Sequence, residues 1–167
     1  MNRRYNIVVV GGGVTGLLAA TLLARSEQRD RLDVTLVDAA PRPRFRADDD
    51  VDLRVSAIAN GTAGLLDRVD AWEFVAATRA SAYERMRVWD EDGSPEGPAT
   101  LRFDADEFAV PQLGFIVENL LLQEALLQQL ELTSAELRFE SPLQALRRVD
   151  DQYKIDLRTD ETLTADL

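Results

Sequence analysis

The sequence predicts an α/β fold that opens with a βαβ unit and a parallel sheet. The β-branched run Ile7–Val10 leads directly into the glycine-rich segment Gly11–Gly16. The apolar stretch of residues 17–25 then has the composition of a helix, and a second β-rich run, Val34–Val37, ends in Asp38. Strand, turn, helix and strand in this order form the unit that joins two parallel strands.

Each glycine of the turn has a mechanical role in binding a dinucleotide. Gly11 allows the tight turn that leaves the first strand, and Gly13 lacks a Cβ, so a pyrophosphate can approach the backbone. Gly16 lets the helix pack closely on the strand. Free N–H groups and the positive end of the helix dipole then meet the phosphates. Val14 and Thr15 complete this predicted phosphate-binding segment.

Asp38 stands at the tip of the second strand, where a carboxylate can accept both hydroxyls of an adenosine ribose. Its charge would repel a 2′-phosphate. The sequence therefore predicts a bound FAD or NAD, and not NADP.

The middle of the chain predicts a helix and a small sheet. Apolar residues recur at near-helical spacing after Asn60, a plausible cap, and indicate one helix that is broken or loosened near Asp70. Met86–Trp89 is a predicted strand, and Ala99–Phe103 is expected to return beside it. Gly114–Val117 is expected to add a further strand to the same sheet.

Residues 118–132 carry the strongest helical pattern in the chain, with an apolar face at Leu121, Leu122, Ala125, Leu126 and Leu130. The remainder is interpreted as a strand meander. Its predicted strands are residues 137–140, 143–149, 153–158 and 162–167.

Composition excludes several classes of function. The 19 basic and 30 acidic residues give a formal charge of −11, which argues against a nucleic-acid partner. The chain has no cysteine and no histidine, so thiol chemistry, a Ser-His-Asp triad and a zinc site are excluded within it, and no metal site is expected. No run of about 18 uninterrupted apolar residues predicts a membrane span.

Several stretches resemble the flavin-dependent hydroxylases of ubiquinone biosynthesis, the 2-polyprenylphenol and 2-polyprenyl-6-methoxyphenol hydroxylases of the p-hydroxybenzoate hydroxylase-like class. The resemblance covers essentially all 167 residues. The matching stretches are Gly11–Gly16, Asp52–Ile58, Met86–Asp90, Leu113–Asn119 and Leu122–Leu126.

The resemblance implies a Rossmann-like FAD-binding βαβ region with a parallel sheet and a β-meander, plus part of a small substrate-domain sheet. It assigns the FAD pyrophosphate to the three glycines and the adenosine ribose to Asp38. Arg54 resembles the arginine that reaches over the cofactor near its pyrophosphate, and Asn119 and Gln123 match polar positions on the helix along it. No catalytic acid or base can be named.

The implied activity is monooxygenation of a polyprenylated phenol, with FAD as cofactor and NAD(P)H as transient co-substrate. Two alternatives stay open: another FAD-dependent oxidoreductase of the same fold class, and a non-catalytic FAD-binding or assembly protein. The ring position, the tail length and the electron donor are not fixed. A cytoplasmic location is expected; contact with the inner membrane, membership of a biosynthetic complex and homo-oligomerisation stay open.

The expected organisation has three regions. Residues 1–80 form the FAD-binding βαβ region, residues 81–117 part of the substrate-domain sheet, and residues 118–167 the FAD-domain helix and the meander. The sequence closes on an uncapped predicted strand, Thr162–Leu167. It is therefore expected to be the N-terminal part of a longer enzyme and inactive alone; completion of the sheet by a partner subunit is the alternative.

Overall fold

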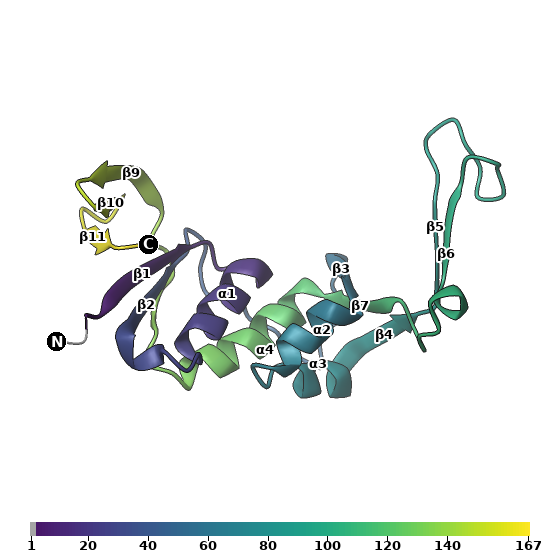
Figure 1. Cartoon of the computed structure of the whole chain (residues 1–167), viewed down its shortest axis with the longest axis horizontal. Coiled ribbons are helices and arrows are strands. Elements are labelled where there is room, and N and C mark those ends of the chain that lie inside the picture. Colours follow the sequence, from purple (N-terminus) through teal and green to yellow (C-terminus); the bar gives the residue numbers. More distant parts are fainter. Residues whose placement is uncertain (1–2) are drawn as a thin grey trace.

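A computed structural model describes residues 3–167, and a three-stranded parallel sheet forms one end of its central body (Figure 1). The strands are β1 (Tyr5–Val10), β2 (Leu32–Val37) and β8 (Glu136–Arg138), in the order β1-β2-β8. The predicted βαβ unit is confirmed, with α1 (Val14–Ala24) between β1 and β2. Assignment of the β8 segment to the meander was wrong, because β8 pairs in parallel with β2.

Helix α4 (Asn119–Glu131) packs beside α1 and supplies much of the core. Leucine has a high helix propensity. Leu121, Leu122, Leu126 and Leu130 are fully buried in one core cluster that also contains residues of α1 and β2. The predicted helix of residues 118–132 is thus confirmed to within one residue at each end.

A second sheet in the order β3-β7-β4 continues the body. β7 (Gly114–Glu118) pairs antiparallel with both β3 (Val55–Ala59) and β4 (Ala80–Tyr83). Placing residues 114–117 in one sheet with residues 86–89 was wrong. The latter segment forms β5 (Arg85–Val88), which pairs only with β6 (Leu101–Asp104) among the described residues, as a projecting two-stranded arm (Figure 1).

The helix predicted after Asn60 is two helices, α2 (Asn60–Asp67) and α3 (Trp72–Arg79). They are separated where expected, because Asp70 adopts a left-handed conformation with φ of 58° that a continuous helix cannot contain. Asn60 does not cap α2, since its side-chain amide donates to the carbonyl of Gln112 at 2.7 Å.

The meander consists of β9 (Leu143–Val149), β10 (Gln152–Leu157) and β11 (Thr162–Ala165), as predicted for these three segments. The residues after β11 join it to the body: the Asp166 amide donates to the Asn6 carbonyl at 2.8 Å, and the Val8 amide donates to the Leu167 carbonyl at 3.0 Å. Two short 3₁₀ helices, η1 (Arg29–Arg31) and η2 (Ala105–Phe108), complete the elements.

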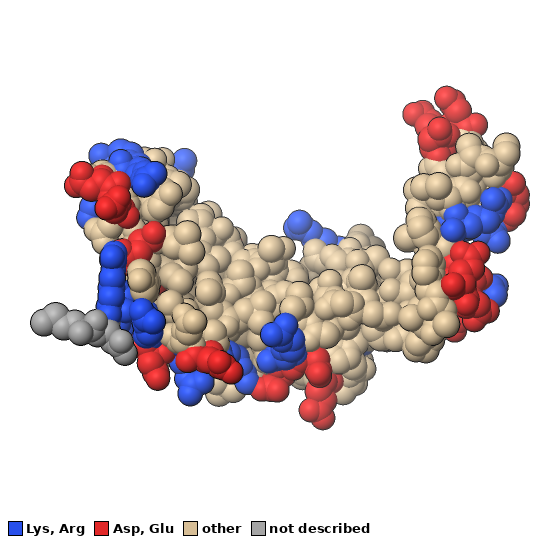
Figure 2. Space-filling view, viewed as in Figure 1, with Lys and Arg blue, Asp and Glu red and all other residues tan. Residues whose placement is uncertain are grey.

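The meander and the arm rise from the two ends of the central body on the same side (Figure 1). Charged side chains gather over both, whereas the concave surface between them is mostly uncharged in this view (Figure 2). None of the helices within residues 3–167 combines the length and the apolar character needed to cross a membrane. The division of the chain into three regions, with boundaries at residues 80 and 117, stays a prediction.

Candidate functional site

The glycine-rich turn connects β1 to α1 in a conformation that only glycine adopts easily. Gly11 has φ of +111°, and its amide donates to the Val37 carbonyl at 2.8 Å. α1 begins at Val14, three residues before the predicted start. Gly13 is its extended N-cap; it offers no side-chain cap, and no acidic residue lies in the first turn. The first amides of α1 are therefore free to bind an anion.

Two glycines of this turn differ in their surroundings. A Cβ added to Gly16 would overlap the carbonyl oxygen of Gly11, so this position requires glycine for close packing. A Cβ added to Gly13 would meet nothing within 4 Å. The space in front of Gly13 is thus open and lies where a ligand can approach the backbone.

A cavity of about 440 Å³ opens at this turn. Both α1 and α4 begin beside it, so the positive ends of two helix dipoles face the same space. Most of the predicted cofactor-binding residues come together here. The lining residues are Gly13, Val14, Thr15, Asp52, Arg54, Ser56, Asn119, Leu120 and Gln123.

Short hydrogen bonds order the polar side chains of this cavity. The Gln123 amide donates to the Gly12 carbonyl at 2.8 Å and so ties α4 to the turn. The Ser56 hydroxyl donates to Asn119 Oδ1 at 2.6 Å, which joins β3 to the start of α4. Arg54 is exposed, and its backbone amide donates to Asp52 Oδ1 at 2.9 Å.

Asp38 and Gly11 line a separate cavity of about 480 Å³. The Asp38 carboxylate accepts from the Gly12 amide through Oδ2 and from the Ala40 amide at 2.6 Å through Oδ1. These bonds hold the carboxylate against the turn. The structure therefore divides the predicted residues other than Gly16 between two cavities, with the Gly11–Gly13 turn between them, and Gly16 lines neither.

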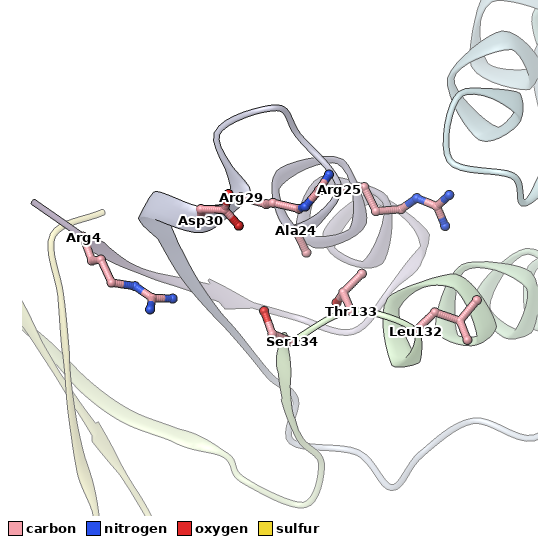
Figure 3. A pocket seen from close by; sticks show the side chains of 8 residues that line it. All are labelled: Arg4, Ala24, Arg25, Arg29, Asp30, Leu132, Thr133 and Ser134. Atoms are coloured by element: carbon pink, nitrogen blue, oxygen red, sulfur yellow. The ribbon is translucent and has the colours of Figure 1, made fainter. Parts of the chain in front are cut away.

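A third cavity, of about 730 Å³, contains none of the predicted site residues. It lies near the other ends of α1 and α4 and is lined by Arg4, Ala24, Arg25, Arg29, Asp30, Leu132, Thr133 and Ser134 (Figure 3). Arg4 pairs with Asp33, and Arg25 pairs with Asp70. Because two of its three arginines are ion-paired and none of the predicted residues lines it, this cavity is not assigned to the site.

Some lining residues were not identified from the sequence. Asp52 and Ser56 flank Arg54 within the family-like stretch Asp52–Ile58, so their proximity to Arg54 was an available signal. The Asp38 cavity is also lined by Ser141, Pro142, Leu143 and Arg158. No local pattern marks these residues, because they reach Asp38 only through the pairing of β8 with β2 and the placement of the meander.

The chain is similar to known proteins in sequence and in fold. The model of the NAD(P)-binding Rossmann-like domain matches residues 9–86. The chain is 36% identical over 167 residues to the 3-demethoxyubiquinol 3-hydroxylase of Escherichia coli (strain K12), covering 99% of this chain and 40% of that protein. It is 37% identical over 131 residues to the ubiquinone biosynthesis monooxygenase COQ6 of Xenopus tropicalis, covering 78% of this chain and 27% of the relative.

Among solved structures, the p-nitrophenol 4-monooxygenase PnpA of Pseudomonas putida DLL-E4 matches with a TM-score of 0.70 and 20% identity, over 99% of this chain and 40% of that one. This likeness shows the fold. The chain thus spans well under half the length of these relatives. The resemblance carried by its motifs is confirmed: over nearly all its residues the chain is similar to the 3-demethoxyubiquinol 3-hydroxylase, and over most of them to COQ6.

Proposed function

We propose that the chain binds FAD and forms the FAD-binding part of a monooxygenase that hydroxylates a polyprenylated phenol in ubiquinone biosynthesis. The observation that carries the proposal is the pair of cavities on either side of the glycine turn, with an uncapped helix start between them. A dinucleotide has a nucleoside at each end of a diphosphate, and this arrangement matches that division.

The residues present fit this cofactor. The free amides of Val14, Thr15 and Gly16 would bind the diphosphate, which Gly13 leaves room to approach. Asp38, fixed by two backbone amides, would hold the adenosine ribose. Arg54, Asn119 and Gln123 would contact the portion that lies in the cavity between the two helix starts, as polar side chains lining it.

When bound, the flavin supplies the chemistry, using electrons from NAD(P)H to activate O₂ and place one oxygen atom on a phenol ring. The chain itself contributes binding, orientation and shielding of the cofactor from water. Substrates of this kind carry lipid-like tails, so we include peripheral contact of the complete enzyme with the inner membrane in the proposal.

Titration of the purified chain with FAD tests the binding proposal. We expect flavin fluorescence to change saturably, with NADP⁺ competing poorly because Asp38 repels a 2′-phosphate. Riboflavin, which lacks the diphosphate and the adenosine, is the control and is expected to bind much more weakly. A chain that binds riboflavin as well as FAD, or neither, would contradict the proposal.

A second assay addresses the reaction. With NAD(P)H, O₂ and a polyprenylphenol, the complete enzyme is expected to yield a product heavier by one oxygen atom, detected by mass spectrometry. The 167-residue chain alone is expected to show no turnover. Unchanged substrate with the complete enzyme would favour a different oxidoreductase activity or a non-catalytic role.

A further inference from the structure

A long irregular segment supplies one wall of the cofactor cavity. Residues 39–54 contain no helix or strand, and they carry Asp52 and Arg54 to the cavity opposite the glycine turn. The segment runs along the surface with no buried residue, and an irregular stretch of this length needs anchors if its side chains are to keep fixed positions.

Glu118 anchors this segment from the end of β7. Its side chain is only 4% exposed, and Oε1 accepts a hydrogen bond from the Asp52 amide at 2.7 Å. Its other oxygen, Oε2, lies 3.0 Å from Arg79 Nε, close enough for an ion pair but without the alignment of a hydrogen bond.

Arg79 extends the anchor further along the same segment. Its guanidinium donates to the Asp49 carbonyl at 3.0 Å and to the Arg46 carbonyl at 3.4 Å. It also lies 5.2 Å from the centre of the Phe45 ring. One arginine at the end of α3 therefore joins the segment at three residues and meets the carboxylate of Glu118.

The pair stands behind the cavity wall. Neither Glu118 nor Arg79 lines the cavity at the glycine turn; both line a smaller one, of about 270 Å³, together with Val51 and Val55 from the two ends of the 51–55 stretch. Burying a charge is costly unless it is paired and hydrogen-bonded, and the buried Glu118 carboxylate meets both conditions: it is paired with the half-buried Arg79 and accepts from the Asp52 amide.

We propose that Glu118 and Arg79 are positioning residues that fix the Asp52–Arg54 wall and thereby set the affinity of the site for FAD. This inference rests on the proposed function, because it assigns the pair a role in binding the same cofactor. A wall that is ordered before binding spares the cofactor the entropic cost of ordering it.

Two variants separate this role from a purely structural one. Glu118→Gln keeps an acceptor for the Asp52 amide but leaves Arg79 without its anion, so it is expected to lower both thermal stability and FAD affinity. The double variant Glu118→Gln with Arg79→Met removes both charges and keeps an apolar stem against Phe45. It is expected to regain thermal stability, yet to bind FAD about tenfold more weakly than the wild type, because the bonds to Arg46 and Asp49 are lost.

The control is Arg25→Met. Arg25 has a similar side-chain exposure, 28% against 25% for Arg79, and it bonds to Gln129 and Asp70 away from the cavity. FAD affinity is expected to be unchanged in this variant.

Amide hydrogen exchange adds a measurement that needs no cofactor. In the double variant, exchange of residues 49–54 is expected to accelerate while exchange of α1 and α4 is not. Wild-type exchange and wild-type FAD affinity in that variant would overturn the inference. A wild-type chain that fails to bind FAD would instead contradict the proposed function, and the exchange result would still decide whether the pair anchors the segment.

Discussion

Gly13 and Gly16 belong to one motif, but the structure gives them separate tasks. Packing of the protein itself requires glycine at position 16, because a side chain there would collide with the Gly11 carbonyl. Gly13 faces open space, so the protein alone tolerates a side chain at that position. Its extended backbone, with φ of −71°, is also accessible to alanine.

A pair of alanine substitutions tests this division. Gly16→Ala is expected to destabilise the chain by about 1–3 kcal/mol, because the turn and helix must move apart. Gly13→Ala is expected to leave thermal stability unchanged and to weaken FAD binding by tenfold or more, an effect of at least about 1.4 kcal/mol. Melting curves and FAD titrations of both variants provide the measurement. Equal losses of stability in the two would contradict this account.

From the residues alone, the site residues that could be predicted are those whose roles depend on local sequence, whereas Arg54, Asn119 and Gln123 were predicted through the resemblance to a family. A glycine turn between a strand and a helix places Gly11, Gly13 and Gly16 by itself. Asp52 and Ser56 reach the cavity through β3 and the long segment before it, and their neighbours there come from α1 and α4. Such proximity depends on tertiary packing, which periodicity does not encode.

Among the elements, long helices and β-branched strands were predictable and short strands of small residues were not. β3 and β4 contain several alanines and serines, which have weak strand preference, and only pairing with β7 makes them strands. The assignments of β7 and β8 to sheets failed for a related reason. Each pairs with strands that lie far from it in the sequence, and a strand pattern does not name its partner.

Within α4, burial predicts which leucines hold the core. Leu126 is fully buried, whereas Leu132, just after the helix, is 77% exposed. Leu126→Ala is expected to lower the free energy of unfolding by about 2–5 kcal/mol, because neighbouring side chains only partly fill the space that the leucine leaves in the core. Leu132→Ala serves as the matched control and should change it by less than about 0.5 kcal/mol. Denaturant unfolding measures both, and similar values for the two would show that α4 is packed differently.

The two-stranded arm formed by β5 and β6 has little packing to stabilise it. All four residues of β5 are exposed, and a two-stranded hairpin is marginally stable by itself in water. Hydrogen exchange in this chain is expected to be fast across residues 85–104 and slow across β1 and β2. Protection of the arm equal to that of β1 would mean that something covers it in solution.

At the scale of the whole molecule, the Asp166 carboxylate adds side-chain contacts to the backbone bonds that join the meander to the body. Asp166 accepts from the Asn6 amide at 2.9 Å and from Gln152 at 3.3 Å, and it pairs with Arg3 at 3.1 Å. The Asn6 amide, then Gln152 and Arg3, lower the pKa of Asp166 below its ordinary value of 3.8. The charged form is therefore favoured by folding.

The sign of this shift predicts an acid-dependent loss of stability. The contribution of Asp166 is complete above pH 3.8 and disappears as the pH falls through the lower pKa of the folded state. The melting temperature of the wild type is expected to exceed that of Asp166→Asn at neutral pH, and the difference should shrink below pH 3.8. Comparing the two proteins removes the effect of other carboxylates; a difference independent of pH would argue against this role.

The two amide bonds of Asp38 bear on any redesign of nucleotide preference. An engineer who wished to admit a phosphorylated ribose would exchange this acid for a neutral or basic residue. Here the substitution would also remove the carboxylate that accepts from the Gly12 and Ala40 amides. A change in nucleotide preference would therefore be accompanied by distortion of the loop. A workable design must first supply a substitute acceptor, which makes the preference of this chain hard to change in a single step.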